Sequence, residues 1–102
     1  MSVKPLRFIL EARQEFLYEV AYYNGVEPGL GERFTKAVEE AAARVVAFPA
    51  AGSPSISNTR RVLTKGFPFS IIYRLQKEEI VVFAVAHQAQ KPGYWRSRVF
   101  SR

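Results

Sequence analysis

The chain contains no cysteine, and this absence removes several classes of function at once. It rules out disulfides, thiolate metal sites and a cysteine nucleophile. There is also no aspartate and only one histidine, which argues against a metal site built from several side chains. We therefore expect no metal and no cofactor.

Long apolar runs are missing as well. No stretch approaches the roughly 20 apolar residues that a membrane helix needs. Residues 1–7 also lack the long apolar core of a leader peptide. We therefore expect no association with a membrane, and a soluble, cytoplasmic protein.

The sequence does contain enough apolar material for one core. The chain has 102 residues, of which 48% are hydrophobic and 14% are aromatic. A chain of this length is typical of one domain, so we expect a single folded unit over residues 1–102. Neither repeats nor low-complexity segments interrupt it.

Positive charge is concentrated in the C-terminal part of the chain. Residues 60–102 carry nine Lys or Arg against two Glu, a net charge of +7, whereas residues 1–59 carry six against seven. A one-sided field of this kind favours association with polyanions or with acidic protein segments. Surface cations that serve only solubility are the alternative.

A short strand and a first helix are predicted near the N-terminus. The apolar run at residues 6–10 favours a strand. From position 12 onward, Phe16, Val20 and Tyr23 recur at steps of four and three, which is the helical period. The pair Asn24-Gly25 predicts the end of this helix.

A second helix is expected to begin near Pro28, whose fixed φ suits a first helical turn. Its apolar positions are Leu30, Phe34, Val38, Ala41, Val45 and Phe48. On its outer face we expect ion pairs of Glu32 with Lys36 and of Glu40 with Arg44.

The second half of the sequence indicates a small sheet. Residues 50–58 are rich in Pro, Gly and Ser and predict a loop, and residues 60–65 can form a strand. Residues 69–87 predict an antiparallel hairpin, because the connector 76–79 is short and polar. Residues 80–86 are apolar at every position, so this strand is expected to be covered on both faces.

The apolar stripes of the two helices need a cover, and one face of the predicted third strand can provide it. That face carries Phe69, Ile71, Tyr73 and Leu75. The expected fold is therefore α+β, with a short N-terminal strand and a helical hairpin packed on a small antiparallel sheet. The opposite face of the strand is amphipathic and places Arg74 over a groove.

This order of elements, together with three motifs, resembles the RelE/ParE superfamily of type II toxin–antitoxin toxins, and its ParE-like branch most closely. The motifs are Phe67-Pro68-Phe69-Ser70-Ile71-Ile72-Tyr73-Arg74, the strand end Ala84-Val85-Ala86-His87, and the tail Lys91-Pro92-Gly93-Tyr94-Trp95-Arg96. The resemblance spans nearly the whole chain.

The resemblance implies a small basic toxin that a cognate antitoxin neutralises, in a toxin–antitoxin hetero-oligomer. ParE-like members poison DNA gyrase and are not free-standing enzymes. RelE-like members are endoribonucleases that cut messenger RNA on the ribosome. The chain is expected to follow the first pattern, with the ribonuclease and a non-toxic basic binding module as alternatives.

For a nuclease, the catalytic candidates are Arg60, Arg61, Arg74, His87 and Tyr94. Basic side chains would hold phosphates, the imidazole could act as acid or base near neutral pH, and aromatic rings could stack on bases. The family nuclease pattern, however, places a lysine-rich second strand and a terminal arginine where this chain has few lysines and His87. No complete catalytic set is present, which favours the ParE-like interpretation.

For target or antitoxin binding, the candidates are Arg60, Arg61, Lys65, Arg74, His87, Lys91, Tyr94, Trp95, Arg96 and Arg98. Each has a structural alternative. His87 could bond to the tail or to a strand carbonyl, and the tail aromatics could fold back on the core as a lid. The tail arginines could be solvated charge, and those near position 60 could protect a sheet edge. The helical hairpin and the sheet edge are expected to expose apolar residues that an antitoxin covers.

Overall fold

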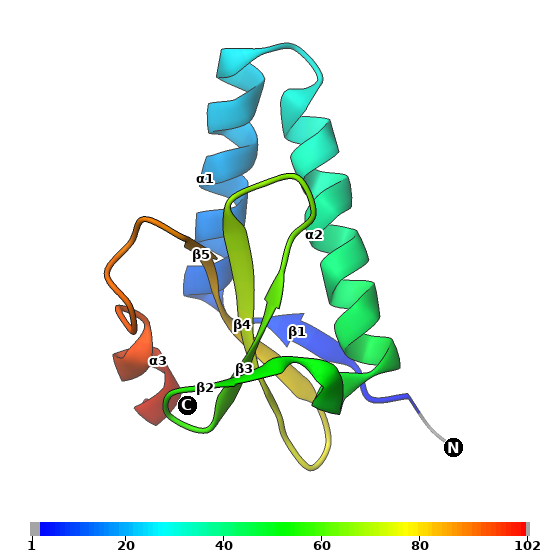
Figure 1. Ribbon diagram of the computed structural model, residues 1–102, viewed down its shortest axis with the longest axis vertical. Coiled ribbons are helices and arrows are strands. Elements are labelled where there is room, and N and C mark those ends of the chain that lie inside the picture. The colour runs from blue at the N-terminus through cyan, green and yellow to red at the C-terminus, as the bar shows by residue number, and fades with distance from the viewer. Residues whose placement is uncertain (1–2, 102) are drawn as a thin grey trace.

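A helical hairpin stands on one face of a five-stranded sheet in the computed structural model, which describes residues 3–101 (Figure 1). The helices are α1 (Leu10–Val26), α2 (Leu30–Ala47), the short 3-10 helix η1 (Pro49–Ala51) and α3 (Arg96–Phe100). The strands are β1 (Leu6–Phe8), β2 (Ser53–Ser55), β3 (Thr59–Leu63), β4 (Phe69–Leu75) and β5 (Ile80–His87). The predicted α+β class and the helical hairpin are confirmed.

The sheet has the order β1-β5-β4-β3-β2. Strands β2 to β5 form an antiparallel meander, and the predicted hairpin over residues 69–87 is confirmed. β1 pairs with β5 in parallel. The sheet is therefore mixed, whereas the sequence predicted an antiparallel sheet. The reason is the route of the chain: the helical hairpin carries it from β1 to the far edge, and the meander then returns to β1.

The turn between the helices differs from the prediction. Asn24-Gly25 does not end α1, which continues to Val26. The side-chain oxygen of Asn24 instead accepts the N–H of Gly31 at 2.9 Å and so satisfies the start of α2. α2 begins at Leu30, after Gly29 at φ +88°, a conformation that favours glycine.

The core between the helices and the sheet is aromatic. Phe34 of α2 is fully buried and lies 5.1–5.2 Å, centroid to centroid, from Tyr23, Phe67 and Phe69. Phe48, predicted on the same stripe, is 69% exposed because α2 ends at Ala47 and the chain then leaves the helical conformation.

Only one of the two ion pairs predicted on the outer face of α2 forms. Glu32 lies 3.8 Å from Lys36. Arg44 donates instead to the Leu63 carbonyl oxygen, which ties α2 to β3. The Glu40 to Arg44 prediction is therefore wrong.

The prediction of a loop at residues 50–58 is also wrong, because the segment holds η1 and β2. The Tyr73 hydroxyl donates to the Pro49 carbonyl at 2.6 Å and ties the segment to the core. The turn into β3 uses Ser57 and Asn58 at φ +60° and +55°. Short polar residues tolerate this conformation, so the turn needs no glycine.

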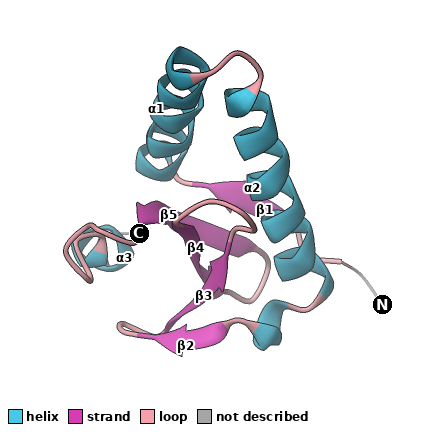
Figure 2. Ribbon diagram, turned by 45° about the horizontal axis from the view of Figure 1, so that its top comes forward, coloured by secondary structure: helices cyan, strands magenta, loops and turns pink. Residues whose placement is uncertain are grey.

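β5 is buried from Ile80 to Val85 on both faces, as predicted. The helices cover one face, and the C-terminal segment, residues 88–101, folds back over the other (Figure 2). Ile72 pairs with Ala84 and Tyr73 with Val82, which leaves Phe83 as the extra residue of a β-bulge. Within residues 3–101, no helix is long and apolar enough to span a membrane.

Candidate functional site

A groove of about 440 Å³ lies on the sheet face opposite the helices, between the strands and the C-terminal segment. We call it the open-face groove. Its floor comes from β3, β4 and β5, and residues 88–95 form one wall. Its lining includes Ser55, Ile56, Arg61, Leu63, Ser70, Ile72, His87, Lys91 and Tyr94. Five of the predicted site residues therefore line one groove: Arg61, His87, Lys91, Tyr94 and Trp95.

Four of the predicted cations are exposed and available for a partner. They are Arg61, Lys65, Lys91 and Arg96. Within residues 3–101, their side chains make no hydrogen bond or ion pair. Arg61 and Lys91 line the open-face groove, and Arg96 packs beside Gly93 on its wall. These three cations give the groove a positive rim.

Two other predicted cations are used to hold the sheet edge. Arg60 donates to the Gly52 carbonyl at 2.8 Å. Arg74 donates to the Asn58 carbonyl at 3.1 Å and to that of Ser57, and so fixes the turn between β2 and β3. Their guanidinium groups are thus bound to backbone oxygens at this edge of the sheet.

The remaining predicted cation, Arg98, is bound to a glutamate that the sequence interpretation did not select. The Glu15 carboxylate accepts two hydrogen bonds from the Arg98 guanidinium, both at 3.0 Å, and one from the Tyr94 hydroxyl at 2.6 Å. It also accepts the Val85 N–H at 3.1 Å. The side chains of Glu15 and Arg98 are only 21% and 18% exposed. We call these three side chains the Glu15 network.

The Glu15 network changes the acid–base properties of its members. Burial raises the pKa of Tyr94, and the hydrogen bond and charge of Glu15 raise it further. Burial opposes the charge of Arg98, but the hydrogen bond and charge of Glu15 outweigh it and raise the Arg98 pKa. The Tyr94 phenol therefore stays protonated near neutral pH and is unsuited to act as a base.

The tail aromatics fold back on the sheet. Trp95 is 4% exposed and belongs to the core, together with Val99 at 2%. At Gly93, whose φ is +76°, a Cβ would come within 2.7 Å of Ile56, so the tail and the β2–β3 turn are in close contact. The Trp95 ring is thus not available for stacking on a base in this conformation.

His87 lies at the end of β5, on the groove. Its Nδ1 accepts the N–H of Ala89 at 2.9 Å, and its ring meets Phe69 edge to face at 4.9 Å. The imidazole therefore bonds to the tail, which was one of the alternatives for this residue. Among residues 3–101, no three His or Glu side chains stand close enough to hold a metal ion.

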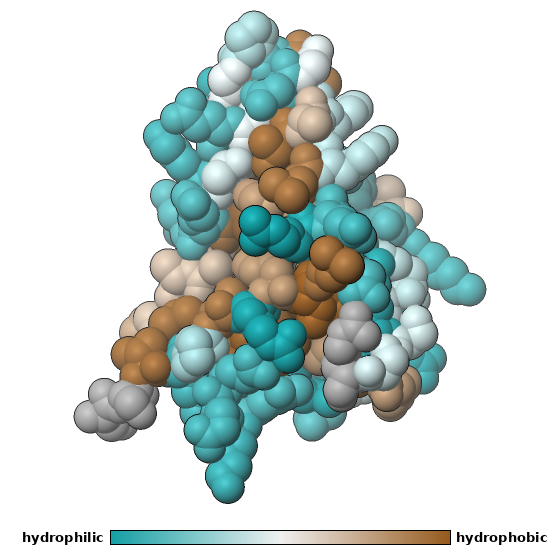
Figure 3. Space-filling model, turned by 180° about the vertical axis from the view of Figure 1, so that it is seen from behind, coloured by the Kyte–Doolittle hydropathy of each residue, from teal (hydrophilic) through white to brown (hydrophobic). Residues whose placement is uncertain are grey.

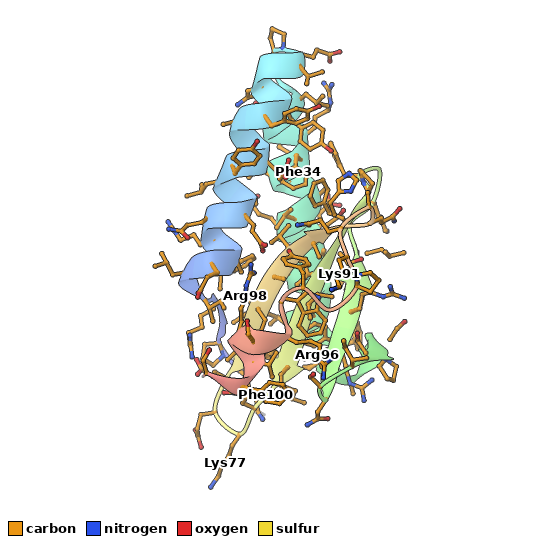
Figure 4. All side chains as sticks on the ribbon, turned by 90° about the vertical axis from the view of Figure 1, so that its left-hand side faces the viewer. Phe34, Lys77, Lys91, Arg96, Arg98 and Phe100 are labelled. Atoms are coloured by element: carbon orange, nitrogen blue, oxygen red, sulfur yellow. The ribbon has the colours of Figure 1, made fainter. Side chains whose placement is uncertain are left out.

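The two sides of the C-terminal segment differ. Figure 4 shows Arg98 on the side that faces α1, whereas Lys91 and Arg96 lie on the other side. The only sequence signal for Glu15 was that Glu11, Glu15 and Glu19 recur at steps of four on α1 while the tail is basic. Chemically, the groove offers cations and rings suited to binding.

A second candidate surface is apolar. Seen from behind, the molecule carries a band of apolar residues that runs down the middle of this face, with hydrophilic residues on both sides (Figure 3). α1 alone exposes five large apolar side chains to at least 50%: Leu10, Leu17, Tyr18, Tyr22 and Val26. The expectation that the hairpin exposes apolar residues is thereby met, and such a surface is typical of a protein-binding site.

Comparison with known proteins identifies a family. The family model described as "ParE toxin of type II toxin-antitoxin system, parDE" matches residues 6–92. A solved structure described as "Chromosomal ParDE TA system from P. aeruginosa" is similar in fold, with a TM-score of 0.66 and 23% identity, covering 83% of this chain and 96% of that one. No curated protein matches the chain.

Proposed function

Because the chain belongs to the ParE toxin family of type II toxin–antitoxin systems, we propose that it inhibits growth by poisoning DNA gyrase and that a cognate antitoxin neutralises it. Its place of action is then the cytoplasm, where gyrase works on DNA. The toxin acts by binding to its target and breaks no bond itself.

One observation favours gyrase over messenger RNA: most nuclease candidates are already engaged within the fold. Arg60 and Arg74 donate to backbone carbonyls. Tyr94 donates to a carboxylate, and its pKa is raised by burial first and by Glu15 second. A ribonuclease needs a group poised to take a proton from the ribose hydroxyl. What the open-face groove offers instead is a cationic rim suited to an acidic surface of a protein target.

The test is a pair of reactions with the purified chain. The first contains DNA gyrase, ATP and plasmid, and linear DNA is measured after detergent and protease. The second contains messenger RNA and translating ribosomes. Accumulated linear DNA with intact RNA is the expected result. Cut RNA with unaffected gyrase would overturn the proposal and support the ribonuclease, and no effect in either reaction would leave only a binding module.

The contribution of the groove can be separated from net charge. Lys91→Gln and Lys65→Gln each remove one exposed lysine, but only Lys91 lines the groove. Lys91→Gln is expected to weaken inhibition of gyrase by about fivefold, since one charge contact at an interface contributes on the order of 1 kcal/mol. Equal effects of the two substitutions would mean that the groove is not the contact.

The antitoxin is proposed to cover the exposed apolar side chains of α1. A partner segment with an apolar face would bury the side chains that α1 exposes, in a toxin–antitoxin hetero-oligomer. Without it, the free chain is expected to self-associate, and the double substitution Tyr18→Ser with Tyr22→Ser should reduce this self-association. Phe48→Ser is the control, because Phe48 is 69% exposed but lies outside α1. A free chain that stays monomeric in light scattering would contradict this part of the proposal.

A further inference from the structure

The Glu15 network lies beside the part of β5 that has no neighbouring strand on its outer edge. β1 pairs with β5 only as far as Val82. From Phe83 onward, the outer edge of β5 is met by side chains: Arg98 donates to the Phe83 carbonyl at 3.0 Å, and Val85 donates to Glu15. The bulge at Phe83 is therefore part of the same arrangement as the network.

Glu15 connects the two layers that cover the sheet. It belongs to α1, which packs with the helical layer, yet its carboxylate binds two residues of the segment on the opposite face. The Arg98 guanidinium also stacks on the Tyr94 ring, with Cζ 5.1 Å from the ring centroid. A bidentate ion pair fixes the orientation of the two side chains as well as the distance between them. The pose of the C-terminal segment is thereby fixed from the helical layer.

We propose that Glu15 is a positioning residue for the toxin: through Tyr94 and Arg98 it holds the C-terminal segment in the pose that presents Lys91 and Arg96 at the open-face groove. This inference rests on the proposed function, in which the groove meets the target. It adds a residue of α1 that lies outside the groove and does not line it.

The network is more than a surface ion pair. Glu27 and Arg33, at the tip of the hairpin, also form a pair, but their side chains are 59% and 58% exposed. Exposed pairs of this kind contribute little. The Glu15 carboxylate is mostly buried and accepts hydrogen bonds from three residues. Glu15→Gln removes its charge and replaces one of its two acceptor oxygens with a donor, which leaves the Arg98 guanidinium without its counter-charge. The match to the family ends at residue 92, before Tyr94 and Arg98.

The fluorescence of Trp95 can report whether the C-terminal segment is in place. It is the only tryptophan of the chain, it lies between Tyr94 and Arg96, and it is 4% exposed. Release of the segment would move its ring into water and shift its fluorescence to longer wavelength. Glu15→Gln and Arg98→Gln are therefore expected to red-shift the emission of Trp95 and to speed amide exchange of residues 88–101 by at least about tenfold. The amides of β4 are expected to keep their protection.

Two matched controls isolate the effect. Glu40→Gln removes an exposed carboxylate of α2, and Arg96→Gln removes an exposed arginine of the same segment. Glu40→Gln should change neither emission nor inhibition of gyrase. Arg96→Gln should leave the emission of Trp95 unchanged and weaken inhibition, whereas Arg98→Gln should change both.

Each outcome decides the inference. Unchanged emission and exchange in Glu15→Gln would overturn it, whatever the target. Equal loss of protection in β4 and in residues 88–101 would also overturn it, because the network would then serve general stability. If the parent chain does not inhibit gyrase, the proposed function fails, while the emission and exchange data still test whether Glu15 holds the segment. A released segment with full inhibition of gyrase would remove the positioning role.

Discussion

The two faces of the sheet are covered by layers of different chemistry. The helical layer packs through aromatic rings, with Phe34 fully buried among Tyr23, Phe67 and Phe69. The C-terminal layer has a small apolar anchor and a network of charged and polar side chains around Glu15. Apolar packing stabilises a layer without a preferred direction, whereas bidentate hydrogen bonds fix the orientation of the groups that they join. The molecule thus separates the layer that supplies stability from the layer that presents cations.

The largest expected effect is on the helical layer. Phe34→Ala should lower the free energy of unfolding by about 3–5 kcal/mol, since it removes a fully buried ring and leaves a cavity. Urea unfolding followed by circular dichroism measures this. Phe48→Ala is the control, because Phe48 is 69% exposed and the substitution should change stability by less than about 0.5 kcal/mol. Similar losses of unfolding free energy in the two variants would contradict the central role of Phe34 in the helical layer.

The C-terminal layer is expected to show strong coupling between two charges. A double-mutant cycle of Glu15→Gln and Arg98→Gln should give a coupling energy of about 1–3 kcal/mol, because the pair is mostly buried. The same cycle on Glu27 and Arg33, which are more than half exposed, should give about 0–1 kcal/mol. Salt should weaken only the exposed pair. Equal couplings would show that burial does not set the strength of the Glu15 pair.

A smaller effect is expected where β2 joins the sheet. Tyr73→Phe removes the hydrogen bond to the Pro49 carbonyl and should lower stability by about 1 kcal/mol. A Cβ at Gly52 would overlap with the Tyr73 hydroxyl, so Gly52→Ala should be destabilising in the parent chain and less so in the Tyr73→Phe chain. Thermal unfolding of the four proteins measures this. Additive effects of the two substitutions on stability would show that a side chain at position 52 does not meet the Tyr73 hydroxyl.

The smallest expected effect concerns Glu19, on α1 between the two layers. Burial raises its pKa above the ordinary value of 4.5, and the charge of Glu15 raises it further, although His87 opposes the shift. A raised pKa means that the contribution of Glu19 to stability is fully present below pH 4.5 and is lost as the pH rises through the folded-state value.

Glu19→Gln should therefore be more stable than the parent at neutral pH, with the difference disappearing below pH 4.5. Urea midpoints measured between about pH 4 and pH 7 test the sign. Glu40→Gln, at an exposed position, provides the baseline. A stabilisation that is constant with pH would refute the assignment to Glu19 ionisation.

The pattern of apolar residues was sufficient to predict the regular parts of this fold. The helical stripe through Phe34 follows from spacing, because burial repeats with the period of the helix. The doubly buried strand β5 follows from its uninterrupted apolar run. Spacing did not indicate β2, since Pro54 and two serines favour a loop and the strand depends on pairing with Arg60 and its neighbours. Pairing partners distant in sequence override local preference.

The candidate site was less predictable for a similar reason. Residue type selected the cations as candidates, but it could not tell the exposed Arg61 and Arg96 from Arg60 and Arg98, which are bound within the fold. That distinction depends on which carbonyl or carboxylate the fold brings near. Glu15 is separated from Arg98 by 83 positions, and no local pattern connects them.

The shortness of β1 bears on how the chain avoids aggregation. An open strand edge can template the addition of a strand from another molecule. Here the outer edge of β5 past Val82 is capped by the side chains of Glu15, Arg98 and Gln90, which occupy its amide and carbonyl groups. The C-terminal segment therefore protects this edge of the sheet. A toxin without the segment would expose the edge of β5, to which strands of other molecules would add.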